Sequence, residues 1–214
     1  MPRKPRQSGF SMIELLIVVA VGLVIAGFAI PSYITARRNY RIAGDARHMK
    51  SELLLAKMRA AARFTRTRVR FDFGARTFQT DFWDKGGDAW MPIAIAGPTN
   101  LSQGVNFGFG SMTDPPTNPE DGTPTQTTLE MPPICKEGAG GTPDDPGAGA
   151  DVADMACIVF NSRGFPVDDA GTLNGERAIY VTDGNAVEGA TLSVTGIARI
   201  WRGDSSDATY WIKR

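Results

Sequence analysis

The chain has 214 residues, of which 42% are hydrophobic and 21% are charged, so it holds enough apolar material for one globular unit. Its single histidine, His48, lies on a basic segment, and no phosphate-binding glycine motif is present, so the sequence predicts no enzyme. The formal net charge of zero conceals a division, because residues 37–70 carry a net charge of +9 and residues 72–214 a net charge of −11. The basic segment could attract acidic parts of neighbouring molecules or anionic lipid head groups, or both segments could be solvated faces.

The first element is an apolar run from Phe10 to Ile30, in which Glu14 is the only ionisable side chain. A helix of this length crosses a bilayer core of about 30 Å. A carboxylate in such a helix costs roughly 2.5 to 3.5 kcal/mol at the bilayer centre and less near an end, so Glu14 indicates a functional site. The alternative is an acid that is tolerated because its side chain reaches the interface.

Residues 1–9, MPRKPRQSG, precede this run with three basic side chains and end at Gly9. A secretory signal has an apolar core of about 7 to 15 residues, followed by a cleavage site of small residues. Here the apolar run is longer, and no such site follows it before Pro31. The small residue stands in front of the apolar run instead.

This arrangement resembles the leader of type IV prepilins. Gly9 stands at the family's cleavage position, Phe10 at its N-methylated first residue, Glu14 at its acidic fifth residue and Pro31 at its helix-kinking proline. The resemblance implies that a prepilin peptidase removes residues 1–9 and that the chain crosses the bacterial inner membrane once, with a cytoplasmic N-terminus and a periplasmic head. It also implies that Glu14 pairs with the N-terminal amine of a neighbouring subunit, so that neither charge is buried alone.

Beyond Pro31, residues 31–64 are predicted to form an amphipathic helix stem. Apolar or small side chains recur there at steps of three or four residues, which is typical of one helix face. These positions are Ile42, Ala46, Met49, Leu53, Ala56, Ala60 and Phe64. The predicted helix runs from Phe10 to Phe64, and its second half needs a surface to cover.

Residues 65–214 are predicted to form a β-rich head. Apolar and polar side chains alternate in residues 69–73 and 78–82 around a Gly-Ala turn, which predicts a β-hairpin. Further candidate strands are residues 90–95, 105–109, 127–131, 157–160, 177–182, 191–201 and 209–212. Residues 111–150 are rich in Gly, Pro, Thr and Asp and are expected to be an irregular insertion. The expected fold is α+β: a long N-terminal helix, with a transmembrane half and an amphipathic half, packed on an antiparallel β-sheet head.

Within the prepilin class, the chain resembles the GspH/FimT family of minor pseudopilins. The segment SELLLAKMRAAARFTRTRVRF resembles the region after that family's transmembrane part, and CIVFNSRGFPVDDAGTL, AIYVTDG and LSVTGIARIWR resemble its C-terminal strands. The resemblance excludes roughly residues 111–150. It implies a minor subunit of a type II secretion pseudopilus or of a type IV pilus. Its partners would be other pilin or pseudopilin subunits, prepilin peptidase and inner-membrane lipid, and no cofactor is implied.

Some FimT-like proteins are associated with DNA uptake through a basic C-terminal motif, from which this chain departs. Arg199 and Arg202 lie three residues apart but not directly after Gly196. With Trp201 and Trp211 available to stack on bases, they would form a small phosphate-contacting patch. The alternative is an ordinary strand with solvated polar side chains, and the acidic head makes DNA the less favoured partner.

A second alternative function is that of a single-pass anchored periplasmic binding protein that never polymerises. Such a protein would keep residues 1–9, whereas a processed pilin would begin at Phe10 with a methylated amine.

The two cysteines, Cys135 and Cys157, would form a disulfide in an oxidising compartment or remain two thiols. No Cys-x-x-Cys motif or nearby histidine accompanies them, so no zinc site is expected. The acids of this region do not fit an EF-hand loop, so a solvated loop is favoured over a calcium site. These acids are Asp144, Asp145, Asp151 and Asp154.

Overall fold

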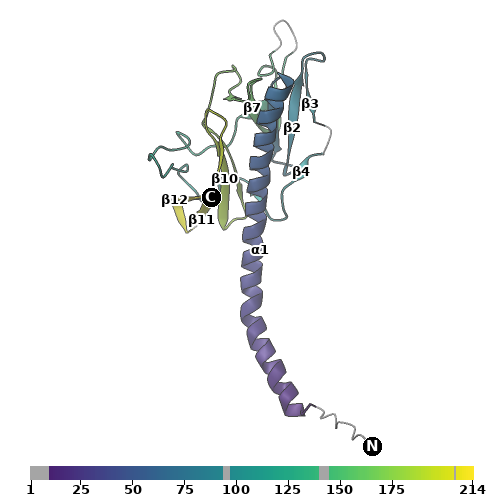
Figure 1. Ribbon diagram of the computed structural model, residues 1–214, viewed down its shortest axis with the longest axis vertical. Helices are drawn as coiled ribbons and strands as arrows, with labels where there is room; N and C mark the ends of the chain where they lie inside the picture. The colour runs from purple at the N-terminus through teal and green to yellow at the C-terminus, as the bar shows by residue number, and fades with distance from the viewer. Residues whose placement is uncertain (1–9, 94–96, 140–144, 205) are drawn as a thin grey trace, which may run out of the picture. The chain divides into compact units, whose positions relative to one another are not determined.

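The computed structural model describes residues 10–93, 97–139, 145–204 and 206–214. The predicted leader, with its cleavage residue Gly9, lies outside these residues. Two compact units are distinguished, one ending at Tyr40 and the other comprising Arg41–Arg214, and helix α1, Met12–Arg63, contributes to both. The predicted α+β fold, one long N-terminal helix followed by an antiparallel β-sheet head, is confirmed (Figure 1).

Helix α1 begins after Ser11, whose carbonyl accepts hydrogen bonds of 3.1 Å from the backbone N–H groups of Glu14 and Leu15. The helix continues through Pro31, although proline has no N–H to donate within it. A kink at Pro31 stays a prediction. The helix ends at Arg63, and Phe64 has a φ of 52°, the left-handed conformation that commonly follows a helix.

The second half of α1 buries the predicted stripe of apolar and small side chains. Six of the seven predicted positions are fully buried: Ile42, Ala46, Met49, Leu53, Ala56 and Ala60. The seventh, Phe64, is 76% exposed, because the helical period does not extend past Arg63. The repeat of three and four residues therefore identifies the packed face of the helix but not its last residue.

Two antiparallel sheets, rather than one, provide the surface that this stripe covers. The first sheet contains β1 Thr67–Asp72, β2 Thr77–Asp84, β3 Ala89–Pro92, β4 Thr99–Asn100, β6 Ile134–Lys136, β7 Asp151–Phe160 and β8 Pro166–Val167. Its order is β3-β2-β1-β7-β6, with β4 pairing with β2 and β8 with β7. The second sheet contains β5 Asn106–Phe107, β9 Arg177–Thr182, β10 Ala186–Leu192, β11 Ala198–Asp204 and β12 Asp207–Lys213, in the order β12-β11-β10-β9-β5. In Figure 1 the two sheets flank α1, with β2 to β4 on one side and β10 to β12 on the other.

One hydrophobic core joins α1 to both sheets. It includes Phe71 of β1 and Phe160 of β7 from the first sheet, together with Ile179 of β9 and Ala190 of β10 from the second. Alternate residues of each strand point to the same face, so the apolar residues of each alternating run gather under the helix. The amphipathic half of α1 thus belongs to the core of the head.

Hydrogen bonds fasten α1 to both sheets as well. The Thr67 hydroxyl of β1 donates to the Ala56 carbonyl at 2.7 Å, and the Thr80 hydroxyl of β2 donates to the Glu52 carboxylate at 2.7 Å. On the other side, the Lys57 ammonium donates to the Thr195 carbonyl at 2.8 Å, in the turn between β10 and β11. The Thr67 bond is buried and the Thr80 bond half-buried, whereas the Lys57 bond lies at the surface.

The outer face of the second sheet is covered by part of the predicted insertion. Met112 packs there with Tyr180 of β9 and Val187 of β10. The Tyr180 hydroxyl donates to the Gln126 side chain at 2.5 Å, and a Cβ at Gly189 would lie 2.5 Å from the Tyr180 ring, so only glycine fits beneath that ring. These contacts fix the course of the loop over the sheet.

The hairpin of β1 and β2 and the strand at residues 177–182 are confirmed. The prediction of one strand over residues 191–201 is wrong. The chain turns at residues 193–197, where the Gly196 N–H donates to the Ser193 carbonyl at 2.8 Å and Gly196 has a φ of 70°. The apolar residues Val194 and Ile197 in this turn had extended the strand-like pattern through it.

Two further predictions need correction. Residues 127–131 form no strand, because this segment runs over the second sheet as a loop. The loop is held by Gln126, whose side-chain amide donates to the Glu130 carbonyl at 3.2 Å and to the Glu176 carbonyl at 3.1 Å. Residues 111–150 are not wholly irregular, since β6 lies within them and pairs with β7. The predicted strand at residues 90–95 corresponds to β3, and its residues 94 and 95 lie outside the described ranges.

The packed face of α1 can be tested by truncating two leucines of the same helix. Leu53 is fully buried, whereas Leu55 is 36% exposed. We expect Leu53→Ala to lower the free energy of unfolding by about 2 to 5 kcal/mol, because it leaves a cavity in the core. The matched substitution Leu55→Ala should cost less than about 1 kcal/mol. Denaturant unfolding of the full chain in detergent, followed by tryptophan fluorescence, measures both; equal losses would contradict the assigned face.

Candidate functional site

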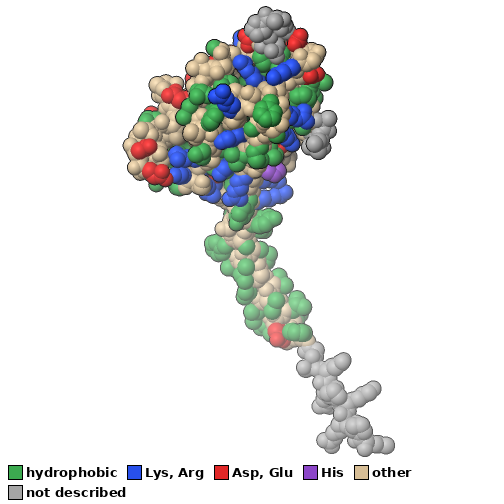
Figure 2. Space-filling view, turned by 45° about the horizontal axis from the view of Figure 1, so that its top comes forward, with side chains coloured by type: hydrophobic (Ala, Val, Ile, Leu, Met, Phe, Trp, Pro, Cys, Tyr) green, Lys and Arg blue, Asp and Glu red, His purple; other side chains and the backbone are tan. Residues whose placement is uncertain are grey.

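The N-terminal part of α1 exposes almost all of its apolar side chains. From Phe10 to Tyr40, the exposed fraction of the large hydrophobic side chains ranges from 84% at Met12 to 47% at Ile34. Figure 2 shows this segment covered by hydrophobic side chains. In length and composition α1 is the one helix of the described chain that could cross a membrane. A continuous apolar surface of this extent indicates burial in lipid or against other proteins.

Glu14 is the acid of the first turn of α1, and its side chain is exposed. Ser11 and Glu14 have the S-x-x-E spacing of a capping box, in which the acid occupies the third helical position. The positive end of the helix dipole also favours a carboxylate in this turn. The sequence analysis assigned Glu14 to pairing with a neighbouring subunit, and it did not use the S-x-x-E spacing, which also suits this acid to the start of a helix.

Phe10 precedes the first helical residue and is 82% exposed. Together with Glu14 it places one aromatic residue and one carboxylate within about one turn of each other at the start of an apolar helix. The predicted methylation residue, Phe10, and the predicted assembly residue, Glu14, therefore lie near each other at the start of α1. The predicted cleavage residue, Gly9, lies outside the described residues.

Comparison with known families finds one match in this same segment. The model of the prokaryotic N-terminal methylation motif matches residues 4–30. No curated protein and no solved structure matches the chain. The motif indicates a type IV pilin-like protein, and the fold of one long helix followed by an antiparallel sheet head agrees with that class. The motif implies processing by a prepilin peptidase and interaction with other pilin subunits, and it suggests a structural role rather than a catalytic one.

The residues of the predicted DNA-contacting patch do not form one surface. Trp201 is 1% exposed, and its indole N–H donates to the Thr191 hydroxyl at 2.8 Å, so it offers no face for a base. Arg199 and Arg202 lie on opposite faces of β11, since side chains alternate along a strand and their positions differ by three. Trp211 packs on Tyr180, with ring centroids 5.6 Å apart. The prediction of a stacking surface built on Trp201 is therefore wrong.

Arg202 instead faces the side of the sheet that α1 covers, where it pairs with a buried acid. Its Nη1 atom lies 3.3 Å from Oε1 of Glu188, and Arg214 Nε lies 3.9 Å from the same oxygen. Glu188 is fully buried, and burial raises the pKa of its carboxyl, an effect that Arg214 and Arg202 oppose. Sequence reasoning counted Glu188 only among the acids of the head, because nothing in its local pattern marks it as buried.

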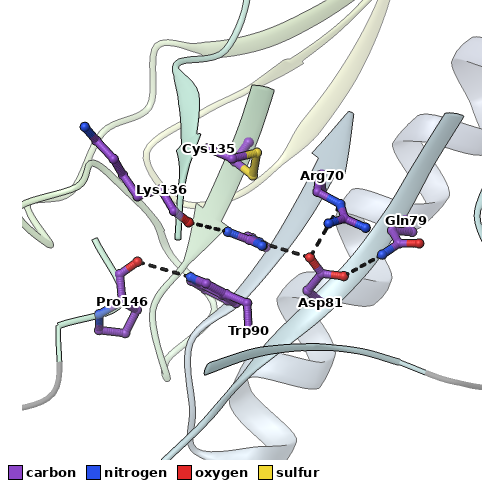
Figure 3. The surroundings of a disulfide bond; sticks show 9 residues. Arg70, Gln79, Asp81, Trp90, Cys135, Lys136 and Pro146 are labelled. Carbon is purple, nitrogen blue, oxygen red and sulfur yellow. Dashed lines mark hydrogen bonds and ion pairs between the residues drawn. A yellow bond between two sulfur atoms is a disulfide. The ribbon is translucent and has the colours of Figure 1, made fainter. Parts of the chain in front are cut away.

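The two cysteines are bonded to each other in the structure. Cys135 of β6 and Cys157 of β7 have their Cα atoms 4.9 Å apart (Figure 3). The bond ties the short strand β6, within the insertion, to a long strand of the first sheet. A strand of three residues gains little from pairing alone, so the bond supplies much of its attachment.

A buried ion pair lies beside this bond. Arg68 Nε lies 3.0 Å from Asp81 Oδ2, and Arg68 Nη1 donates to the Lys136 carbonyl of β6 at 2.7 Å (Figure 3). The Arg68 guanidinium also lies 4.4 Å from the Trp90 ring centroid. Burial lowers the pKa of Arg68, and Asp81 opposes that effect. Since an unpaired buried charge is strongly destabilising, these contacts of Arg68 link β1, β2 and β6.

The acids considered for calcium are dispersed. Asp145 lies 3.9 Å from Arg66, Asp151 pairs with Lys136 at 2.5 Å, and Asp154 has a φ of 57° in β7, while Asp144 lies outside the described residues. Across the described ranges, no three His, Cys, Asp or Glu side chains are grouped to hold a metal ion.

The disulfide makes a measurable prediction. The bond closes a loop between residues separated by 22 positions. Replacing both residues, Cys135→Ser plus Cys157→Ser, should lower the free energy of unfolding by about 3 kcal/mol. Reduced wild-type protein serves as the control and should match the double variant. Alkylation and mass spectrometry of protein from native membranes would contradict the bond by finding two free thiols.

Proposed function

We propose that this chain is a minor pilin or pseudopilin of the GspH/FimT type, a subunit of a type II secretion pseudopilus or of a type IV pilus. One observation carries the proposal: the prepilin motif over residues 4–30 coincides with the N-terminal part of α1, whose large apolar side chains are exposed. Such a helix is stable in a membrane before assembly and among other helices after it.

In this function the leader ends at Gly9, and prepilin peptidase cuts after it. Phe10 then carries the new amine, which is methylated. The Glu14 carboxylate of one subunit pairs with the amine of a neighbour when the apolar helices come together. The pair supplies direction and register to a surface that is otherwise uniformly apolar, because a charge in hydrocarbon is costly unless its partner is present.

The proposed topology has a cytoplasmic N-terminus, one crossing of the bacterial inner membrane, and a periplasmic head. The leader contributes three basic side chains, but basic residues also follow the apolar run closely, so charge alone does not decide the orientation. The bond between Cys135 and Cys157 supports an exported head, because disulfides persist in the periplasm and are rare in the cytosol.

Processing tests the first step. Mass spectrometry of the protein from its native membrane should find a chain that begins at Phe10 with one added methyl group. Gly9→Val should keep residues 1–9 attached, since a branched side chain replaces the small residue at the cut, whereas Ser8→Ala should be processed normally. A wild-type protein that retains residues 1–9 would instead support an anchored protein that never polymerises.

Assembly tests the second step. Glu14→Gln should insert in the membrane and be processed normally, yet its co-purification with the other subunits should fall at least about a hundredfold, the effect of losing one partner of a buried ion pair. The control is Glu52→Gln, the same change in the same helix, where Glu52 accepts a hydrogen bond from Thr80 inside the head. Normal incorporation of the Glu14 variant would refute the pairing.

A further inference from the structure

Two exposed arginines lie near the end of the first compact unit of the chain. Arg37 and Arg38 closely follow Ile34, the last large aliphatic residue of the exposed apolar surface, and Glu14 is the only acidic residue between Phe10 and Tyr40. Neither arginine has an acidic side chain within salt-bridge distance among the described residues. Two cations without counter-charges therefore adjoin a surface that calls for lipid or protein cover.

Several later basic residues of the segment 37–70 differ from these two, because they contact the head. The Arg68 guanidinium pairs with Asp81, and the Arg63 guanidinium lies 4.4 Å from the ring centroid of Phe82. Others bind carbonyl or carboxylate oxygens: Arg41 binds the Gln103 carbonyl, Lys57 the Thr195 carbonyl, Arg66 the Asp145 carboxylate and Arg70 the Asp81 carboxylate. No such contact within the described ranges accounts for Arg37 and Arg38.

The position of the two arginines along α1 matches the depth of lipid head groups. The stretch from Leu15 to Ile34 has about 20 residues, the length of helix that crosses a hydrocarbon core of about 30 Å. Arg37 follows Ile34 by three residues, which is about 4.5 Å along the helix axis. The head-group layer on each side of the core is roughly 5 to 8 Å thick. A helix that places Glu14 at one interface therefore places Arg37 and Arg38 at the other.

The geometry of a helix directs these side chains toward the bilayer. The Cα–Cβ bonds of an α-helix tilt toward its N-terminus, and the N-terminal part of α1 is the apolar part. Long basic side chains near the end of a membrane helix extend along it until their charge reaches the interface. Successive residues are turned by about 100°, so Arg37 and Arg38 face two different sides of the helix.

Two exposed tyrosines accompany the arginines. Tyr33 is 67% exposed and Tyr40 is 78% exposed, and they lie one turn before and one turn after Arg37 on the same side of the helix. Tyrosine is enriched where membranes meet water, since its ring is apolar and its hydroxyl is polar. This pair is an indication, independent of charge, that the segment lies at a bilayer surface.

The proposed topology makes the two arginines unusual. Basic residues beside a membrane helix are more frequent on the cytoplasmic side, whereas this topology places Arg37 and Arg38 on the exported side. There they oppose the charge signal for orientation that the leader provides. A binding partner at that side explains why the chain carries them.

We propose that Arg37 and Arg38 bind the phosphate groups of anionic phospholipids in the periplasmic leaflet of the inner membrane, with Tyr33 and Tyr40 at the same interface. A guanidinium donates two parallel hydrogen bonds to one phosphate, and the two arginines bind separate lipid molecules on different sides of α1. The choice of leaflet rests on the proposed function. The contact sets the depth of the helix in the membrane before assembly.

The test adds phosphatidylglycerol to the full chain in nonionic detergent and measures the bound lipid by native mass spectrometry. Phosphatidylcholine is the matched probe, because it carries a phosphate but no net charge. We expect phosphatidylglycerol to bind at least about tenfold more tightly, the combined effect of two basic residues at an anionic surface. Equal affinity for the two lipids would overturn the proposal.

Competition tests the source of the bound anion. Neither inorganic phosphate nor acetylated Gly-Glu-Gly amide, each equimolar with phosphatidylglycerol, should displace the lipid, because neither brings acyl chains to the apolar surface beside the arginines. Displacement by inorganic phosphate would reveal a site for free anions. Displacement by the acidic peptide would assign the arginines to a protein partner, and either result would overturn the proposal.

Single substitutions locate the contact. Arg37→Gln and Arg38→Gln should each weaken phosphatidylglycerol binding about fivefold, the effect of one basic residue near an anionic surface. Arg37→Lys keeps the charge and should weaken binding less than Arg37→Gln does. The control is Arg59→Gln, the same loss of charge near the end of α1, which should bind as the wild type does. Undiminished binding to both glutamine variants at positions 37 and 38 would refute the site.

Melting temperatures check that every variant folds. Because the binding is measured in detergent, it requires neither processing at Gly9 nor pairing through Glu14. Failure of the lipid to bind leaves the proposed pilin function standing. Conversely, a wild-type chain that retains residues 1–9 counts against the pilin function and leaves the lipid result unaffected.

Discussion

The packing of one helix face on two sheets is the contact on which the rest of the head depends. The stripe from Ile42 to Ala60 is fully buried, and three of its members are alanines, which allow strands to approach closely. That approach is why the Thr67 hydroxyl reaches the Ala56 carbonyl at 2.7 Å. Residues of β1, β7, β9 and β10 meet in one cluster with this face, and the two sheets also contact each other directly where Phe71 of β1 packs on Phe107 of β5, with ring centroids 5.8 Å apart.

The sequence correctly predicts those parts of the fold in which apolar residues recur at one regular spacing over many positions. The stripe of α1 and the hairpin of β1 and β2 follow from steps of 3.6 and 2 residues, respectively. The prediction failed over residues 191–201, where Val194 and Ile197 are apolar but lie, half-exposed, in a turn. A second failure, over residues 127–131, has a similar cause. Gln126 is held by Tyr180, a partner 54 positions away that no local pattern indicates.

Among the candidate sites, too, the sequence identified residues that lie close together in the chain and missed those whose partners are distant. The prepilin-type residues Phe10 and Glu14 are local in sequence, and the methylation motif matched over residues 4–30 includes both, while their individual roles stay predictions. Trp201 was misassigned because its burial depends on its surroundings in the second sheet, where its indole donates to Thr191 of β10, and the local sequence pattern does not show this. Glu188 was missed because its surroundings come from other segments of the chain: it meets Arg202, 14 residues on.

The bond between Cys135 and Cys157 has a consequence for the life of the newly made chain. If the head is exported as proposed, both sulfurs are reduced while the polypeptide is being synthesised, and β6 is then attached by three residues of pairing and by Arg68. Maturation of the head would finish only on the far side of the bilayer. The oxidising surroundings there would act as a checkpoint, separating subunits that have crossed from those that have not.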